Sequence, residues 1–234
     1  VQLLLGDTFA LLKKLDNNSS LYANAAKSFK MPTFTQIYGG GGANFAANPL
    51  LEPEEGWTYE FGYKKTSNTS MFKAALYYMD LDTIEYDGDG STEKPYVTRN
   101  MSFKNKGLEL TYEKDFGSKY SYSLGANFCN PMGKNKKGVW ERKFAREQYN
   151  ASIKYHDAKF NAALTGMFTT DRASGWGDLL PVNFIAGYKF DKSSTVELGV
   201  ENIFDRDDIV SNPGATTKYY CLPRMVHVTY TYTF

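Results

Sequence analysis

The sequence predicts an all-β fold, an antiparallel up-and-down sheet whose strands cross a membrane as a segment of a β-barrel. Three observations support this prediction. Apolar and polar residues alternate with a period of two through most of the chain, which places them on opposite faces of each strand. Aromatic residues make up 16% of the sequence, with 18 Tyr, 16 Phe and 3 Trp. Short polar connections alternate with long ones, as they do at the two ends of membrane barrels.

The alternation is clearest at the C-terminus, where every second residue from Val226 to Phe234 is apolar or aromatic and the others are His or Thr. The same period recurs along the chain and predicts about eleven strands and no helix. In chain order, the predicted strands lie at 8–15, 20–29, 57–64, 70–82, 108–113, 119–128, 149–155, 159–169, 181–190, 194–203 and 226–234.

The connections between these strands fall into two classes. The short ones lie at 16–19, 67–69, 116–118, 156–158 and 191–193. The long ones lie at 30–56, 83–103, 129–146, 170–180 and 204–223. Strands of about 9–11 residues with such connections fit a tilted crossing of a bilayer, the long loops being extracellular and the short turns periplasmic.

A soluble sandwich or lipocalin-like barrel is the alternative, with the apolar face packed inside. Strands in such folds recur every 8–12 residues or so, whereas 234 residues over eleven strands give about 21 per strand. Aromatic residues also gather near the predicted strand ends, for example Tyr120, Phe128, Tyr149 and Tyr155. Membrane barrels carry such aromatic girdles at the two interfaces, so the membrane prediction is favoured.

Composition excludes several other classes. The 27 basic and 26 acidic residues give a net charge of +1, so no nucleic-acid partner is expected. No apolar run approaches the roughly 18 residues of a spanning helix, and the aromatic content argues against disorder. The first residue is Val1 and no signal peptide follows it, so we expect either a processed protein or a piece of a longer chain.

Several motifs resemble those of one family, the TonB-dependent outer-membrane receptors. Phe29-Lys30-Met31-Pro32 is followed by Asn48-Pro49-Leu50-Leu51-Glu52-Pro53-Glu54 and then by Tyr59-Glu60-Phe61-Gly62-Tyr63. These resemble the family's Phe-Arg-x-Pro, Asn-Pro-x-Leu-x-Pro-Glu and Tyr-Glu-x-Gly, with Lys30 in place of Arg. Further along, Asn105-Lys106-Gly107-Leu108-Glu109, Asn202-Ile203-Phe204-Asp205 and Pro223-Arg224 are similar to later motifs of the family, the last without its glycine.

The resemblance implies that residues 1–234 form the C-terminal part of a barrel of 22 strands that normally surrounds a plug. The plug, the TonB box and about half of the barrel are absent from this sequence. Because an open half-barrel would leave strand edges unpaired in lipid, we expect the chain to close with a further piece. In the family, the last strand, here with Tyr230, Tyr232 and Phe234, is recognised by the outer-membrane barrel assembly machinery.

The same resemblance implies a location in the outer membrane of a diderm bacterium and active transport of a scarce nutrient. A ferric siderophore is the commonest cargo of the family, followed by cobalamin or another metal complex. The energy would come from the TonB–ExbB–ExbD complex, and lipopolysaccharide and outer-membrane lipid would surround the barrel. No catalytic residue, cofactor or resident metal is implied.

Candidate substrate-binding residues lie in the long connections. The first contains Gln36, Tyr38 and Phe45 around the glycine run 39–42, which gives a mobile backbone; a flexible loop without a ligand is the alternative. The others are Arg142 in a basic connection and three aromatic residues that offer stacking surfaces, Trp176, Tyr219 and Tyr220.

Charge is segregated between two of the connections. The connection 129–146 contains Lys134, Lys136, Lys137, Arg142, Lys143 and Arg146. It is predicted to attract anionic ferric chelates, to bind lipopolysaccharide phosphates, or simply to be solvated. The acidic stretch 80–93 includes Asp87-Gly88-Asp89-Gly90, which only partly resembles a calcium loop. Calcium binding there, and a bridge between Cys129 and Cys221, are left open.

A small barrel enzyme of the outer-membrane protease or lipase type, or a passive diffusion pore, is the alternative function. An enzyme would need a nucleophile with a base, or an acid–His pair. The sequence has only two histidines, His156 in a predicted turn and His227 on the polar face of the last strand. Neither lies in a recognisable catalytic grouping, so no enzyme activity is predicted.

Overall fold

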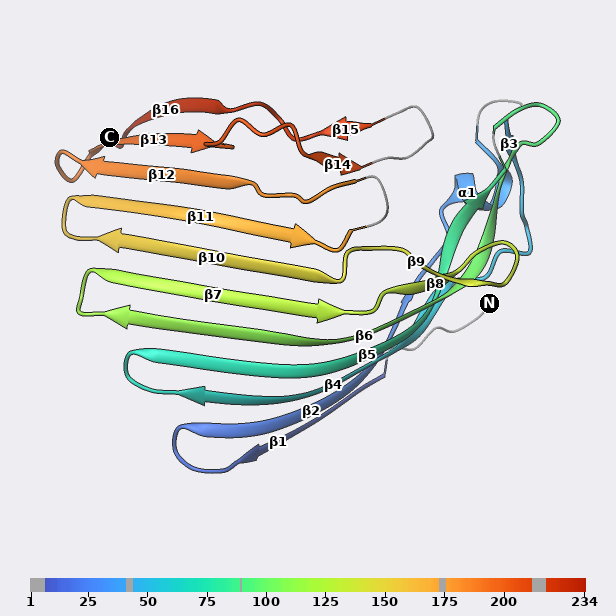
Figure 1. The fold of residues 1–234 in the computed structure, drawn as a ribbon, viewed down its shortest axis with the longest axis horizontal. Coiled ribbons are helices and arrows are strands. Elements are labelled where there is room, and N and C mark those ends of the chain that lie inside the picture. The colour runs from blue at the N-terminus through green and yellow to red at the C-terminus, as the bar shows by residue number, and fades with distance from the viewer. Residues whose placement is uncertain (1–6, 41–43, 89, 173–175, 212–217) are drawn as a thin grey trace.

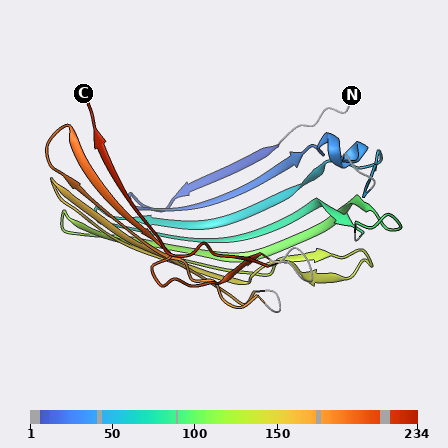
Figure 2. The same ribbon diagram turned by 90° about the horizontal axis from the view of Figure 1, so that it is seen from above.

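The sheet of this protein is broad, curved and almost entirely antiparallel (Figures 1 and 2). The structure is a computed structural model, and it describes residues 7–40, 44–88, 90–172, 176–211 and 218–234. Within these ranges, eleven strands follow one another across the sheet in the order in which they occur in the sequence. They are β1 (Thr8–Lys14), β2 (Ser19–Lys30), β4 (Glu54–Thr66), β5 (Ser70–Asp87), β6 (Tyr96–Phe116), β7 (Tyr120–Cys129), β10 (Glu147–His156), β11 (Phe160–Thr170), β12 (Val182–Lys189), β13 (Ser194–Glu201) and β16 (Met225–Tyr232). The predicted fold class is therefore confirmed.

The sheet does not close on itself. Among the described residues, β1 pairs only with β2, and β16 pairs only with β13. Figure 2 shows the resulting open trough, with these two strands at its free edges. A free edge leaves backbone N–H and C=O groups without partners, and in lipid each such group costs several kcal/mol.

Two sequence predictions were wrong in the long connections. The stretch 83–103 is mostly strand, because β5 continues to Asp87 and β6 begins at Tyr96. The ladder runs without interruption through Glu85↔Arg99, and the Arg99 Nε lies 3.1 Å from Asp87 Oδ2. A cross-strand ion pair thus stabilises an extension that the apolar period does not reveal.

The chain also contains a short helix, α1 (Phe34–Tyr38), where none was predicted. Thr33 caps it: the Gln36 amide donates to the Thr33 hydroxyl at 3.3 Å, and the Thr33 amide donates to Gln36 Oε1 at 2.8 Å. This reciprocal capping box satisfies two of the amides that a helix start leaves free. Five further short strands occupy the long connections, namely β3 (Phe45–Ala46), β8 (Met132–Lys134), β9 (Trp140–Arg142), β14 (Ile209–Ser211) and β15 (Tyr219–Tyr220).

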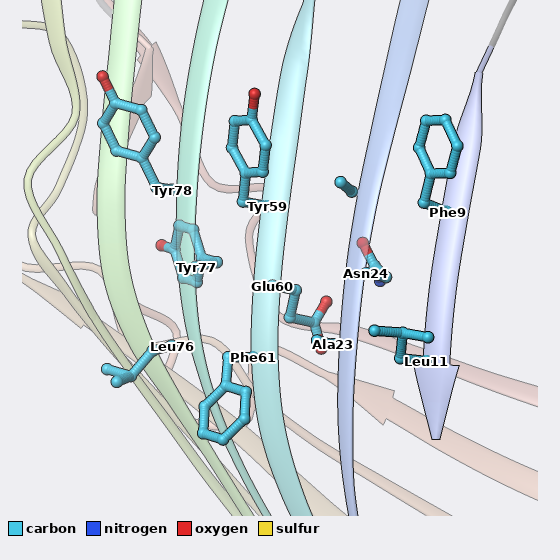
Figure 3. A pocket seen from close by; sticks show the side chains of 11 residues that line it. Phe9, Leu11, Ala23, Asn24, Tyr59, Glu60, Phe61, Leu76, Tyr77 and Tyr78 are labelled. Atoms are coloured by element: carbon cyan, nitrogen blue, oxygen red, sulfur yellow. The ribbon is translucent and has the colours of Figure 1, made fainter. Parts of the chain in front are cut away.

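The register of the ladders separates the side chains into an apolar face and a polar face. On the apolar face, Phe9 is paired with Ala25, Ala25 with Tyr59, and Tyr59 with Tyr78. Figure 3 shows an open pocket on this face, lined from β1, β2, β4 and β5. Nothing in the described part of the chain covers this face, and the Leu11 side chain is 76% exposed. A membrane interior is the environment in which such a face is stable.

Aromatic side chains form two rows on the apolar face. Toward the long connections, ring centroids lie 6.5 Å apart in Tyr59–Tyr78, 5.6 Å apart in Phe128–Tyr149 and 6.3 Å apart in Tyr149–Phe168. Toward the short turns, the row contains Tyr63, Phe72, Tyr112, Tyr120, Tyr122, Tyr155, Phe160 and Tyr188.

The spacing of these rows matches a bilayer. Tyr149 and Tyr155 of β10 are six residues apart, which is about 20 Å at roughly 3.3 Å per residue. Membrane barrels have an apolar band about 25 Å tall between their aromatic girdles. We therefore call the row near the long connections the outer girdle and the other the inner girdle.

Three short turns share one device, an aspartate that accepts hydrogen bonds from the backbone two and three residues later. Asp16 accepts from Asn18 and Ser19, Asp157 from Lys159 and Phe160, and Asp191 from Ser193 and Ser194, all within 2.9 Å. Such carboxylate turns pre-set the reversal of the chain. A hydrogen bond from the Tyr155 hydroxyl and the two amide bonds lower the pKa of Asp157 to about 2.

Candidate functional site: the loop end of the sheet

The long connections gather at one end of the sheet, where α1, β3, β8, β9, β14 and β15 all lie (Figure 1). We call this region the loop end. The predicted substrate residues Gln36, Tyr38, Phe45, Arg142, Trp176, Tyr219 and Tyr220 all belong to its connections. The structure divides them among three groups.

The first group is the connection between β2 and β4, which is held against β6 by hydrogen bonds. The Thr98 hydroxyl donates to the Gln36 carbonyl at 2.8 Å, and the Asn48 side chain donates to the Thr98 carbonyl at 2.7 Å. Asn100 exchanges two hydrogen bonds with the backbone of Glu52. Asn48 and Glu52 belong to the motif quoted above, so that motif holds the connection in place. The side chain of Gln36 is committed to capping α1.

Aromatic rings from this group meet rings from β5 and β6 at the loop end. Phe45 lies 5.4 Å from Tyr96 and 6.1 Å from Tyr86, and Tyr86 lies 6.2 Å from Tyr96, centroid to centroid. Phe45 and Tyr86 are 42% and 56% exposed. We call these three residues the aromatic cluster. Tyr38 is not part of it and contacts Phe34 instead, with ring centroids 4.5 Å apart and the ring planes tilted by 41°.

The second group is the β8–β9 hairpin, in which the basic and acidic connections neutralise each other. Lys136 Nζ lies 3.2 Å from Asp87, and Lys143 Nζ lies 3.0 Å from Glu85 and 3.2 Å from Glu141. A hydrogen bond from Lys136, together with one from Arg99, keeps the pKa of Asp87 below its usual range. The sequence predicts separate roles for these two connections, whereas in the structure they form one network.

Arg142 belongs to a chain of contacts that leads to Trp176. Its guanidinium donates to the Asp171 carboxylate and, at 2.6 Å, to the Arg172 carbonyl, while Arg146 lies 3.7 Å from the same carboxylate. The Arg172 guanidinium lies over the Trp176 ring, 5.0 Å from its centroid, a cation–π contact. Arg172 also donates to the Ile209 carbonyl at 2.6 Å. Arg142 and Arg172 therefore join three of the long connections, and Trp176 packs on Arg172.

The third group is the connection between β13 and β16, organised by Asn202. Asn202 is 7% exposed, has a φ of 48°, and donates from its side chain to the carbonyls of Arg206 and Leu222, both at 2.8 Å. The two remaining predicted substrate residues, Tyr219 and Tyr220, form β15 in this connection. They pair with β14 and are 57% and 52% exposed.

The polar face of the sheet is lined by hydrogen-bonded side chains. The Tyr22 hydroxyl donates to Glu60, and Lys73 lies 3.5 Å from the same carboxylate and 5.5 Å from the centre of the Tyr22 ring. On the neighbouring strands, the Tyr77 hydroxyl donates to Asn127 at 3.2 Å. A face with these groups suits a water-filled or plugged interior.

Sequence reasoning missed several residues that build the loop end. Thr98 and Asp171 fix two of the groups, and Tyr86 and Tyr96 complete the aromatic cluster. Tyr86 and Tyr96 were missed because the apolar period does not reveal that β5 and β6 continue as far as these residues. Thr98 and Asp171 carry no local signal, since their partners lie 62 and 29 residues away.

The remaining candidate groups have simpler surroundings. His227 lies on the polar face opposite Gly199, as predicted, and His156 ends β10. Cys129 and Cys221 are both free thiols. Among the described residues, no three His, Cys, Asp or Glu side chains converge as metal ligands. Asp89 of the partial calcium motif lies outside the described residues. No helix in those residues is long and apolar enough to cross a membrane.

A family model for the TonB dependent receptor-like β-barrel matches residues 8–203. The chain belongs to this family. TonB-dependent receptors are outer-membrane proteins of Gram-negative bacteria, and they are transporters rather than enzymes. The location predicted from the motifs is thus confirmed, and so is their assignment to this family.

Solved receptors of similar structure agree with this assignment. The copper transporter OprC superposes with a TM-score of 0.76 at 14% identity, over 97% of this chain and 39% of its own. A variant of the ferric enterobactin receptor PfeA from Pseudomonas aeruginosa gives 0.75 at 18%, over 98% and 40%. The ferric-catecholate import receptor Fiu from Escherichia coli K12 gives 0.70 at 19%, over 97% and 34%. The chain therefore spans 34 to 40% of the length of these TonB-dependent receptors, and at such identities the likeness concerns the fold.

Proposed function

We propose that residues 1–234 are the C-terminal part of the barrel of a receptor that imports a ferric siderophore across the outer membrane. The apolar face contacts lipid, the polar face lines the interior, and the loop end forms part of the mouth that binds the cargo. Energy comes from the TonB–ExbB–ExbD complex, through parts of the receptor outside this sequence. The last strand, with Tyr230, Tyr232 and Phe234, presents the signal for the barrel assembly machinery.

The aromatic cluster is the observation that carries the cargo proposal. Phe45 and Tyr86 expose ring surface at the loop end, and the Phe45 ring lies beside Gly40 of the same connection. Exposed aromatic rings stack on planar ligand groups, such as the catecholate rings of many siderophores. The basic residues Lys136 and Lys143 are paired with carboxylates, so ring contacts rather than free cations are proposed to select the cargo.

Two solved neighbours named above, PfeA and Fiu, are described as ferric enterobactin and ferric-catecholate receptors, which supports an aromatic iron chelate. The neighbour OprC is described as a copper transporter, so copper serves as the comparison cargo. The first step is to obtain the full-length receptor that contains this chain. Its binding of a ferric catecholate, cobalamin and a copper salt is then measured by tryptophan fluorescence.

We expect saturable binding of the ferric catecholate, and growth of the source cell on that chelate under iron limitation. Replacing both Phe45 and Tyr86 by Ala should weaken binding by about tenfold, since stacking contributes roughly 0.5–1.5 kcal/mol per ring pair. Replacing the exposed Phe116 at the periplasmic end is the matched control and should leave binding unchanged. Binding of copper or cobalamin alone would contradict the iron cargo. Binding of none of the three would contradict the receptor proposal.

A further inference from the structure

The apolar face carries a cluster of lysines near the outer girdle. Lys106 on β6 is paired in register with Tyr78, so it lies in the row of the outer girdle. Two residues closer to the loop end, Lys104 is paired with Asp80 on one side and with Met132 on the other. Since alternate residues share a face, Lys104 and Lys106 both point outward, toward lipid.

The ring of Trp140 contacts two lysine side chains of this region. The Lys104 and Lys134 ammonium groups lie 5.7 and 5.4 Å from the centre of the indole ring, within the range of cation–π attraction. A pocket on the outward face is lined by Trp140 together with Tyr78, Lys104, Asn105, Lys106, Asn130 and Met132. Lys134 and Trp140 are register partners in the β8–β9 hairpin and extend this surface toward the loop end.

The charge of this surface is not balanced by its own carboxylates. Lys104 lies 3.1 Å from Asp80 and is neutralised by it. Asp82, also on β5, is the other acidic residue of this face near the pocket, and its register partner is Ser102. Within the described part of the chain, neither Lys106 nor Lys134 has a carboxylate within ion-pair distance. Two unpaired ammonium groups therefore face outward beside the pocket.

The position of the lysine cluster relative to the two aromatic girdles indicates which layer of the membrane surrounds it. Below it, toward the inner girdle, the same face continues with Leu76, Leu108 and Leu110, which are suited to contact acyl chains. Above it begins the solvent-exposed loop end. The cluster thus lies in the headgroup layer of the outer leaflet, since aromatic girdles mark the two interfaces of a barrel. In a Gram-negative outer membrane, the phosphorylated lipid of that leaflet is lipopolysaccharide.

We propose that Lys106, Lys134 and Trp140 form a binding site for the lipid A part of lipopolysaccharide. The ammonium groups bind phosphate, each with the point-charge geometry of lysine. Trp140 packs against the sugar ring, and one acyl chain follows the apolar surface of Leu76 and Leu108. This site faces lipid and lies apart from the aromatic cluster, so it does not depend on the cargo.

The test uses the full-length receptor extracted from outer membranes in mild detergent. Lipid A that remains bound is counted per receptor by native mass spectrometry. Replacing both Lys106 and Lys134 by Gln should lower this retention at least fivefold. Lys114→Gln is the matched control, because Lys114 lies on the same strand and the same face but at the periplasmic end. The control should retain as much lipid as the unaltered receptor.

Two further measurements keep the result interpretable. Each variant must show the heat-dependent gel shift of a folded barrel, and Lys106→Arg with Lys134→Arg should restore retention if charge is responsible. Purified lipopolysaccharide should raise the melting temperature of the unaltered receptor more than its dephosphorylated form does. Equal retention by the Gln variant, equal stabilisation by the dephosphorylated lipid, or full stabilisation by inorganic phosphate alone would each overturn the proposal. Cargo binding should be the same in all variants, so failure of the cargo proposal would be recognised separately.

Discussion

The ring of Tyr22 on β2 lies against Gly62 on β4, in the place that a Cβ at position 62 would occupy. The Tyr22 hydroxyl reaches Glu60 of the same strand as Gly62. Gly62 and Glu60 belong to the Tyr-Glu-x-Gly motif, so this motif has a structural explanation: one residue holds the hydroxyl and the other leaves room for the ring. Gly199 has the same relationship with His227.

We predict that Gly62→Ala displaces the Tyr22 ring and breaks its hydrogen bond to Glu60. Overpacking of this kind costs about 1–3 kcal/mol. Gly166→Ala on β11 is the control, because a Cβ there would lie 3.5 Å from Val182, an ordinary contact. The midpoint of urea unfolding in detergent micelles should fall for the first variant of the full-length receptor and stay nearly constant for the second. Equal midpoints would contradict this view of the motif.

The turn between β10 and β11 should depend on the ionised form of Asp157. Its pKa is lowered from 3.8 to about 2 in the folded protein. The carboxylate therefore stabilises the turn above pH 4, and this contribution is lost as the pH falls from about 4 to 2. Asp157→Ala should remove it at every pH. Hydrogen exchange of the Lys159 and Phe160 amides measures the effect, and the turn at Asp191 serves as an internal reference.

Asn202 should be among the least replaceable residues of the loop end. Its side chain makes three hydrogen bonds across the connection and its backbone has a φ of 48°. Asn202→Ala leaves these groups without partners and places alanine in the left-handed region, at a cost of roughly 3 kcal/mol. Limited proteolysis should then cut the connection between β13 and β16 faster. Asp207→Ala, at an exposed position in the same connection, should have little effect.

We predict that the Asp171 carboxylate neutralises part of the positive charge that Arg142 and Arg146 present at the loop end. Replacing Asp171, whose φ is 45°, by Asn removes the shared negative charge without placing alanine in the left-handed region. This change should raise the association rate of an anionic chelate about two- to fivefold, because the local potential becomes more positive. The increase should disappear at high ionic strength, where charges are screened. Stopped-flow fluorescence of the full-length receptor measures it. An unchanged rate at low salt would mean that these residues lie away from the cargo's path.

The period of two predicted the strands with good accuracy because each strand has one lipid-facing side. All eleven predicted strands occur, and the C-terminal residues Tyr230 and Tyr232 point to the apolar face opposite Val196 and Ser194. The prediction failed where side chains rather than periodicity decide the structure, as in the ion pair that extends β5 and β6 and the capping box at Thr33. The substrate residues remain a prediction, although the structure places all seven at the loop end. Their partners, such as Asp171 for Arg142, could not be predicted because they are distant in the sequence.

Neighbouring strands along the main path of the sheet follow one another in chain order, either directly or with only the short elements of one long connection between them. Contacts are therefore made between segments close in the sequence, and the contact order is low for a β protein of this size. Loop-closure entropy is lost in small steps when strands are added one at a time, rather than in one long-range closure. Such a sheet can grow by sequential zippering, each finished hairpin serving as the template for the next. A chain that stops at any short turn would then leave the register of the earlier strands unchanged.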